Sequence, residues 1–356
     1  MKQSLLGGDF LLERLYIGEN PKIHQEWGEL LELTGLTTDP PYTSVFGIYE
    51  NEVLVATGAR DDNRLKCVAI HPEHQKGTLF NELLSGLITE AHEQGIDRLF
   101  LYTKPGSVEA FSHLGFRVLA TTPDGVAFME RGTPNLFDYL DQLQESNRAY
   151  EAQHGKVGGP VESIVMNANP FTLGHRALIE NALSRAKRLH LFILTEDASL
   201  IPTEVRERLV REGTADLPGI IYHPTDSYII SRASFPSYFL KKEKEGTKTQ
   251  ATLDAILYRD AIAPALGITN RTVGDEPFDL VTSIYNESLQ EQFRGSITLS
   301  LMPRVSTPEG TVISASRVRA ALMEGDMKTF RLLVPDSTYR FFSSSEGKKL
   351  IRSWRA

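Results

Sequence analysis

The 356-residue sequence contains a single cysteine, Cys67, so it has no pair for an internal disulfide and no cysteine-rich zinc site. It also lacks any run of about 18 apolar residues, and Asp9, Glu13 and Arg14 interrupt the apolar residues near its start. These absences predict a cytoplasmic protein with neither a signal peptide nor a membrane-spanning helix. Cys67 lies within an apolar run, which is typical of a core residue.

An excess of positive charge is also missing. The chain has 38 lysines and arginines against 46 aspartates and glutamates, which gives a formal charge of -8. Because nucleic acid and anionic membranes repel such a chain, we expect neither as a partner. Hydrophobic residues make up 41% of the chain and charged residues 24%, as in ordinary globular proteins, and the length favours two domains.

The first part of the chain is rich in predicted strands. Residues 45–60 contain two β-type runs separated by Glu50-Asn51-Glu52, which predicts a hairpin, and residues 65–70 predict a further strand. Leucines at helical spacing from Leu79 predict a helix that ends near Gly95. Strands are expected at 98–102 and 116–120, on either side of a short helix. This pattern predicts an α+β domain over residues 1–131.

The composition changes after this domain. Residues 132–156 are polar and helical in pattern, and HGKVGGP (154–160) has no periodicity, so we place a helical linker at 132–156. The second domain, residues 157–356, begins with an expected strand at 161–166, a helix at 174–188 and a strand at 189–194. Strand, helix and strand in this order predict a parallel crossover. The fold class is therefore α/β, with a Rossmann-like parallel sheet in the second domain.

A candidate site follows the first strand of the second domain. The segment from Asn167 to His175 lies where that strand ends and a helix begins. In an open parallel sheet, ligands bind outside the carboxyl ends of the strands, and a helix start offers free N–H groups to a phosphate. Gly174 lets a nucleotide approach the backbone closely, and His175 can donate a hydrogen bond to a phosphoryl oxygen.

Two short motifs in this domain resemble those of the nucleotidyltransferase superfamily. TLGH (172–175) matches its T-x-G-H signature, and ISASRVR (313–319) matches its I-S-S-S-x-x-R signature except at Ala315. The resemblance implies adenylyl transfer, in which an acceptor oxygen attacks the α-phosphate of ATP and pyrophosphate leaves. It implies that His175 and Thr172 hold the α-phosphoryl oxygens, that Arg319 contacts the β- and γ-phosphates, and that Mg²⁺ screens the remaining charge. The implied ATP-binding residues are Asn167, Asn169, Pro170, Phe171, Gly174, Gly274, Asp275, Ser314 and Ser316.

Longer segments extend this resemblance to one family. MNANPFTLGH (166–175), EDASLIPTEVRERLV (196–210), SYIISRASFPSYF (227–239) and APALGITNRTVGDEPF (263–278) resemble the acetate:citrate-lyase ligase family, and the likeness covers residues 157–335. That family activates acetate as acetyl-adenylate. It then passes the acetyl group to the thiol of a phosphoribosyl-dephospho-coenzyme-A group on the citrate lyase acyl carrier (gamma) subunit. The resemblance therefore implies acetate, ATP with Mg²⁺, and that subunit as partners.

Acetate requires a cation, because a carboxylate buried without one is strongly disfavoured. The candidate cations are Arg206, Arg232 and Arg271. Ser234, Tyr238 and Phe239 follow Arg232 closely and are expected to shape a small pocket that rejects longer acids. We expect no resident metal site, since His71 and His74 flank a proline turn without further ligands, and His190 is expected to be a core or edge residue.

The first domain resembles the GNAT-type N-acetyltransferase fold, since AFSHLGF (110–116) matches much of that fold's A-x-x-F-Y-x-x-L-G-F signature. The resemblance implies a coenzyme A-binding turn of the form Q/R-x-x-G-x-G/A. When Gln75 is placed at its first position, Thr78 and Phe80 stand where a glycine and a small residue belong. A bulky Phe80 is expected to crowd out a pyrophosphate, so we expect this domain to dock the carrier subunit or to stabilise its neighbour.

Three functions are compatible with these patterns. The first is the AMP-forming ligase described above, which needs a carboxylate and a thiol. The second is an adenylyltransferase that joins AMP to a phosphorylated acceptor such as pantetheine phosphate. The third is an acetyl-coenzyme-A-dependent acetyltransferase, against which the altered turn counts. The sequence favours the ligase.

Overall fold

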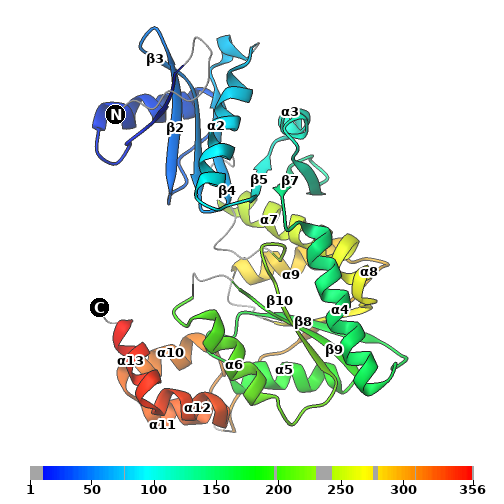
Figure 1. The fold of residues 1–356 in the computed structure, drawn as a ribbon. Helices are drawn as coiled ribbons and strands as arrows, with labels where there is room; N and C mark the ends of the chain where they lie inside the picture. The colour runs from blue at the N-terminus through cyan, green and yellow to red at the C-terminus, as the bar shows by residue number, and fades with distance from the viewer. Residues whose placement is uncertain are drawn as a thin grey trace. The chain divides into compact units, whose positions relative to one another are not determined.

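The computed structural model describes residues 11–75, 77–195, 199–229, 243–275, 280–308 and 310–354. These residues fall into two compact units (Figure 1). The first comprises the residues up to Asp138 together with 243–253, and the second comprises those from Tyr139 to 229 and from Asp254 onward. The predicted domain limits, at residues 131 and 157, stay a prediction. The polar stretch between them forms helix α4 (Leu136–His154).

The first unit is built on a mixed sheet. Its seven strands have the order β1-β2-β3-β4-β5-β7-β6. Neighbours are antiparallel except β4 and β5, which run parallel. This arrangement agrees with the α+β class expected of the first domain. The strands are β1 (Leu11–Arg14), β2 (Ser44–Glu50), β3 (Val53–Asp61), β4 (Arg64–Ile70), β5 (Arg98–Thr103), β6 (Arg117–Thr121) and β7 (Ala127–Gly132).

The hairpin predicted at residues 45–60 is confirmed. Strands β2 and β3 pair antiparallel, and the residues that join them, Asn51 and Glu52, have φ values of 48° and 66°. Positive φ at both positions is the conformation of the tight turn that matches the twist of a hairpin. The local sequence therefore sets both the position and the register of this strand pair.

This unit contains the helices α1 (Pro21–Leu33), α2 (Leu79–Glu93) and α3 (Val108–His113), with short 3₁₀ turns η1 (Pro72–His74) and η2 (Pro105–Ser107). Two of these helices, α2 and α3, follow the predicted pattern, whereas no helix is predicted at α1. Leu83, Leu84 and Leu87 of α2 are fully buried in the core of this unit. Cys67 is buried in β4, and burial raises its pKa to about 12, so its thiol is protonated and serves as a core group.

The second unit contains a parallel sheet, as predicted. Its order is β10-β9-β8-β11-β12, and every neighbouring pair is parallel. The strands are β8 (Val161–Met166), β9 (Arg188–Ile193), β10 (Ile220–Pro224), β11 (Asn270–Gly274) and β12 (Thr298–Met302). The chain moves outward from β8 first toward β10 and then toward β12. The strand order therefore reverses between β8 and β11, which is where a doubly wound sheet forms its ligand crevice.

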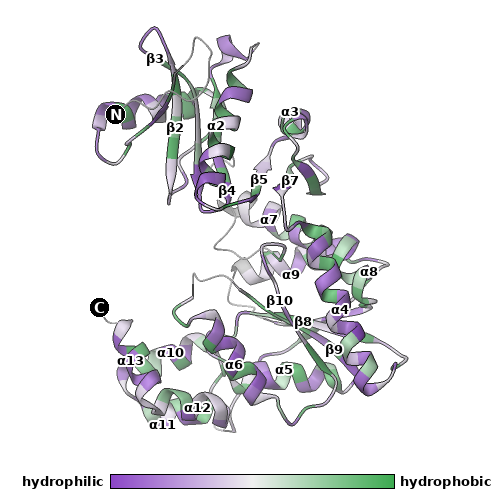
Figure 2. Cartoon of the chain, in the orientation of Figure 1, coloured by the Kyte–Doolittle hydropathy of each residue, from purple (hydrophilic) through white to green (hydrophobic). Residues whose placement is uncertain are grey.

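Helices surround this sheet. Hydrophobic residues gather along the central strands, whereas α5 and α6 carry many hydrophilic residues (Figure 2). One core cluster joins β8 and β9 to α5, α6 and the C-terminal helices. Besides α4, the helices of this unit are α5 (Leu173–Leu183), α6 (Thr203–Gly213), the π-helix η3 (Tyr258–Ile262), α8 (Ala263–Leu266), α9 (Leu280–Gln292), α10 (Ala315–Glu324), α11 (Met327–Leu333), α12 (Asp336–Ser343) and α13 (Ser345–Ser353). Helix α7 (Glu243–Leu257) belongs to the first unit up to residue 253 and to the second from Asp254.

The helix predicted at 174–188 is shorter than expected. Helix α5 ends at Leu183, with Ser184 as its C-cap, and β9 already begins at Arg188. The apolar period continues to Ala186, which is buried, but Arg185 leaves the helical path and reaches Glu162 in β8. A tertiary ion pair therefore overrides the helical pattern over the last residues.

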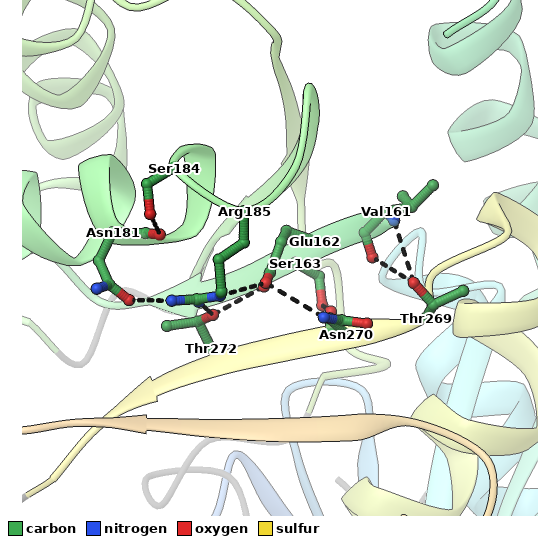
Figure 3. A network of polar contacts seen from close by, with 9 residues as sticks. All are labelled: Val161, Glu162, Ser163, Asn181, Ser184, Arg185, Thr269, Asn270 and Thr272. Atoms are coloured by element: carbon green, nitrogen blue, oxygen red, sulfur yellow. Dashed lines mark hydrogen bonds and ion pairs between the residues drawn. The ribbon is translucent and has the colours of Figure 1, made fainter. Parts of the chain in front are cut away.

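A buried polar network joins α5 to the start of the sheet (Figure 3). The carboxylate of Glu162, which is fully buried, accepts hydrogen bonds from Arg185 Nε (3.2 Å) and Thr272 Oγ1 (2.7 Å). Arg185 Nη2 also donates to Thr272 Oγ1 (2.8 Å), and Asn270 Nδ2 lies 3.4 Å from Glu162 Oε1. The network thus links β8, β11 and the end of α5. Glu162 lies near the amino end of β8, whereas the predicted site lies beyond the carboxyl ends of the strands.

Two buried histidines lie side by side on β9 and β10. Nδ1 of His190 and Nε2 of His223 are 2.8 Å apart, and the rings stack with centroids 5.1 Å apart. Burial lowers the pKa of His190 to about 2 and that of His223 to about 4, so both rings are neutral. The prediction that His190 is a core residue is confirmed.

This pair predicts a loss of stability in acid. The folded pKa values lie below the unfolded value of about 6.5, so below that pH only the unfolded chain takes up protons at these rings. The free energy of unfolding should fall by up to about 1.4 kcal/mol per pH unit for each histidine. Urea unfolding between pH 7 and 5 measures this slope. The double variant His190→Leu/His223→Leu should show a shallower slope, and an unchanged slope would contradict the assignment.

Candidate active site

The TLGH motif forms the first turn of α5. Thr172 is its N-cap, with Oγ1 accepting a hydrogen bond from the backbone N–H of His175 (3.2 Å). In return, the backbone N–H of Thr172 donates to Nδ1 of His175 (3.1 Å). This reciprocal capping box fixes the imidazole ring at the helix start.

The capping box also assigns the proton on His175. Because Nδ1 accepts a hydrogen bond from the Thr172 backbone, the neutral ring carries its proton on Nε2. Burial lowers the pKa of His175 to about 4, so the ring is neutral near pH 7. The side chain therefore offers one N–H donor, at Nε2, and no positive charge.

The ISASRVR motif forms a second helix start. Ser314 is the N-cap of α10, and its Oγ accepts a hydrogen bond from the backbone N–H of Arg317 (3.2 Å). Ser316 Oγ accepts from Arg319 Nη2 (3.1 Å). Each of these two helices thus presents its N-terminal N–H groups and the positive end of its dipole.

Both helix starts line one cavity of about 350 Å³. The ends of β11 and β12 contribute to the same cavity, which places it at the carboxyl ends of the parallel strands. Two of the predicted catalytic residues, Thr172 and His175, line this cavity. So do five of the predicted ATP-binding residues, Gly174, Gly274, Asp275, Ser314 and Ser316. The lining residues are Thr172, Gly174, His175, Leu178, Gly274, Asp275, Met302, Pro303, Arg304, Val305, Ile313, Ser314, Ala315 and Ser316.

The third predicted catalytic residue, Arg319, is not part of this lining. Its Nη1 donates to the backbone oxygen of Asn169 (2.6 Å), and so it joins α10 to the loop before α5. Pro170 and Phe171 complete that loop; the Asn169–Pro170 bond is cis, and Phe171 is fully buried. The structure thus gives Arg319, Asn169 and Phe171 contacts that shape the loop around TLGH.

Arg206 is fully buried beside the same loop. Its Nη1 donates to the backbone oxygen (2.8 Å) and the side-chain oxygen (2.9 Å) of Asn167, and also to the backbone oxygen of Leu194 (2.7 Å). Ser199 Oγ donates to the same side-chain oxygen of Asn167 (3.1 Å). These contacts anchor the loop to α6 and to the end of β9.

Arg271 is also buried, away from the cavity lining. Its Nη2 donates to the hydroxyl of Tyr285 (2.9 Å), and its guanidinium lies 4.3 Å from the centroid of the Tyr258 ring. The third predicted cation, Arg232, lies outside the described residues, as do Ser234, Tyr238 and Phe239. The structure therefore places neither Arg206 nor Arg271 in the cavity that holds His175.

Sequence reasoning missed Arg304, which does line this cavity. It follows Met302, the last residue of β12, and none of the recognised motifs includes it. The sequence feature that could have indicated Arg304 is the one that indicates TLGH, namely a polar residue just beyond the carboxyl end of a predicted parallel strand. The sequence pattern predicts no strand at residues 298–302, so this signal does not reach Arg304.

The described residues contain no group of three or more His, Cys, Asp or Glu side chains that could hold a metal ion. Asp275 is the carboxylate among the described residues that line the cavity. A single carboxylate suits Mg²⁺ that is bound mainly by nucleotide phosphates. Among the residues that the structure describes, no helix is long and apolar enough to cross a membrane.

The first unit has a cavity of its own, of about 550 Å³, between β4 and β5. The first residues of β4 pair with the middle of β5, Arg64 with Phe100 and Leu65 with Leu101. Gln75, Gly77 and Phe80 of the altered turn line the cavity, and Phe80 packs edge-on against Phe111 with ring centroids 5.1 Å apart. The expectation that Phe80 hinders pyrophosphate binding stays a prediction.

The second unit is an α/β domain in which two helix starts line one cavity at the carboxyl ends of a parallel sheet, an arrangement suited to binding an anionic ligand. Comparison with known families agrees with this class, because residues 161–342 match the citrate lyase ligase C-terminal domain. A [citrate [pro-3S]-lyase] ligase of Escherichia coli K12 is 35% identical over 95% of both chains. The corresponding ligase of Klebsiella pneumoniae is 39% identical over 81% of this chain and 83% of its own length. The chain therefore belongs to the citrate lyase ligase family.

Comparison with solved structures returns acetyltransferases. ElaA of Escherichia coli is 14% identical and covers 34% of this chain and 99% of its own, with a TM-score of 0.29. The ribosomal-protein-S18-alanine N-acetyltransferase of Escherichia coli is 18% identical and covers 35% of this chain and 93% of its own, with a TM-score of 0.27.

Proposed function

We propose that the chain is an AMP-forming acid–thiol ligase of the cytoplasm. It activates acetate with ATP and transfers the acetyl group to the prosthetic thiol of the citrate lyase acyl carrier subunit. The observation that carries this proposal is the meeting of TLGH and ISASRVR at one cavity, in a chain of the citrate lyase ligase family. The names of these relatives favour a ligase over the adenylyltransferase alternative.

In the first step, a carboxylate oxygen of acetate attacks the α-phosphorus of ATP. A new P–O bond forms to acetate, the bond between the α-phosphorus and the bridging oxygen breaks, and pyrophosphate leaves with the electron pair. Negative charge moves onto the phosphoryl oxygens in the transition state, so catalysis rests on positioning and on hydrogen-bond donors. In the second step, the carrier thiolate attacks the carbonyl carbon of acetyl-adenylate, and AMP leaves.

Different residues of the cavity bind the phosphate groups and position the donor of the hydrogen bond. Nε2–H of His175 donates to an oxygen of the α-phosphoryl group, since it is the one polar hydrogen of a neutral ring that the capping box holds in place. Thr172 acts as a positioning residue, because its backbone N–H and Oγ1 both bond to His175. The N–H groups at the starts of α5 and α10 bind the remaining phosphate oxygens.

The residues around the cavity support this arrangement. Arg319 and Arg206 hold the loop of residues 167–171 through its Asn169 and Asn167 oxygens. Mg²⁺ that arrives with ATP would neutralise part of the phosphate charge, and Asp275, which lines the cavity, would be its protein ligand. The carrier subunit and its phosphoribosyl-dephospho-coenzyme-A arm are the proposed acceptor.

The test is ATP–pyrophosphate exchange with and without acetate. Acyl-adenylate chemistry predicts exchange that requires acetate, because the reverse reaction can rebuild ATP only from acetyl-adenylate. Addition of the thiol-bearing carrier should then release AMP in step with acetyl transfer. If exchange proceeds equally well without acetate, the ligase proposal fails and an adenylyltransferase takes its place.

A further inference from the structure

The cavity that holds the two helix starts contains one arginine or lysine among its described lining residues, Arg304. Backbone hydrogen bonds fix the chain on both sides of this residue. The residue two positions before it, Met302, accepts a hydrogen bond from the backbone N–H of Asp275 (2.8 Å). The residue after it, Val305, accepts one from the backbone N–H of Ile313 (3.0 Å). Arg304 therefore stands between the end of β11 and the residue just before the N-cap of α10.

The charge in this cavity has to match two anions, the triphosphate and the carboxylate. Phosphate groups are served by the starts of α5 and α10, each of which offers backbone N–H groups. The carboxylate needs a separate cation, since the neutral His175 carries no positive charge. Among the other candidate arginines that the structure describes, Arg206 and Arg319 hold the loop of residues 167–171, and Arg271 lies against Tyr258.

The neighbours of Arg304 also fit a short acid. Met302, Val305 and Ile313 are apolar and line the same cavity. A guanidinium binds a carboxylate through two parallel N–H···O bonds, which leaves the substituent of the acid pointing away from the charge. For acetate that substituent is a methyl group, and apolar side chains beside the arginine provide a surface for it.

We propose that Arg304 binds the carboxylate of the acid substrate and brings it to the α-phosphate of ATP at His175. This inference rests on the proposed ligase function. Arg304 offsets the repulsion between the carboxylate and the phosphates, and its planar fork orients one carboxylate oxygen for attack. It thereby determines that the enzyme activates a carboxylic acid.

The inference is tested by the kinetics of acetate-dependent ATP–pyrophosphate exchange. Arg304→Gln should raise the KM for acetate roughly 10- to 100-fold, as expected for the loss of a charge-assisted bidentate contact, with the KM for ATP nearly unchanged. Arg304→Lys keeps the positive charge but loses the planar guanidinium, so its KM for acetate should lie between that of the unmodified enzyme and that of Arg304→Gln. Arg294→Gln is the matched control, because Arg294 is exposed and precedes β12 whereas Arg304 follows it.

The outcomes separate this inference from the proposed function. Exchange by the unmodified enzyme that ignores acetate would defeat the ligase proposal itself. A raised KM for ATP with an unchanged KM for acetate would overturn the inference and make Arg304 a phosphate ligand. If Arg304→Gln is too slow to assay, equilibrium dialysis with labelled acetate and α,β-methylene-ATP decides. Loss of acetate binding alone supports the inference, and loss of nucleotide binding contradicts it.

Discussion

Replacement of His175 by alanine should lower the rate of acetate-dependent ATP–pyrophosphate exchange by about 100- to 1,000-fold, the usual effect of removing one well-placed transition-state donor. The physical reason is the loss of Nε2–H, which the capping box directs away from the Thr172 backbone. The maximal rate should fall more than the affinity for ATP, because the bond strengthens as charge develops on the α-phosphoryl group. Steady-state exchange at saturating acetate measures both quantities.

A second variant separates chemistry from folding. Glutamine at the same position can still accept from the Thr172 backbone N–H, because glutamine serves in capping boxes. His175→Gln should therefore keep the melting temperature while losing most of the rate. His154→Ala, at an exposed position at the end of α4, is the control for histidine removal. Near-normal exchange in both His175 variants would show that the ring does not touch the reacting phosphate.

The largest expected effect on stability comes from Glu162. Its carboxylate is fully buried and accepts from Arg185 and Thr272 (Figure 3). Glu162→Ala leaves the Arg185 guanidinium without this partner at the edge of the core. Arg185 is about one-third exposed and keeps Asn181 and Thr272 as hydrogen-bond partners, so the loss should be about 1–3 kcal/mol, the usual cost of removing one partner from a buried polar network. Urea unfolding at pH 7 should show this loss as a lower midpoint.

An exposed ion pair provides the matched control. Glu145 pairs with Arg148 on the surface of α4, where both side chains are more than half exposed. Glu145→Ala should change the free energy of unfolding by less than about 1 kcal/mol. Equal effects of the two substitutions would mean that the network in Figure 3 adds no stability beyond that of a surface pair.

Much of the fold could be predicted because local patterns and tertiary packing agree. Alternating apolar residues and the Asn51-Glu52 turn predict β2 and β3, and leucine spacing predicts α2. The parallel sheet follows from the order of strands and helices. Where the two levels conflict, the pattern fails: α5 stops at Leu183 because Arg185 turns to a carboxylate that is distant in sequence.

The candidate site could be predicted only where a motif marks it. TLGH and ISASRVR are far apart in sequence, yet they line one cavity, because each begins a helix near the carboxyl ends of the parallel strands. Arg206 belongs to a recognisable segment, but its burial against backbone oxygens depends on tertiary packing that no spacing shows. Arg304 belongs to no motif, so only the structure shows that it lines the same cavity as His175.

Strand β8 connects two regions with different tasks. Glu162, near its start, belongs to the ion-pair network, and beyond Met166 the chain enters the loop that leads to His175. Substitutions near the start of the strand should therefore change how much folded enzyme accumulates, whereas substitutions beyond its end should change turnover. Laboratory evolution toward a different acid can then alter residues such as Arg304. The protein should stay folded during these changes, because the ion-pair network around Glu162 is left intact.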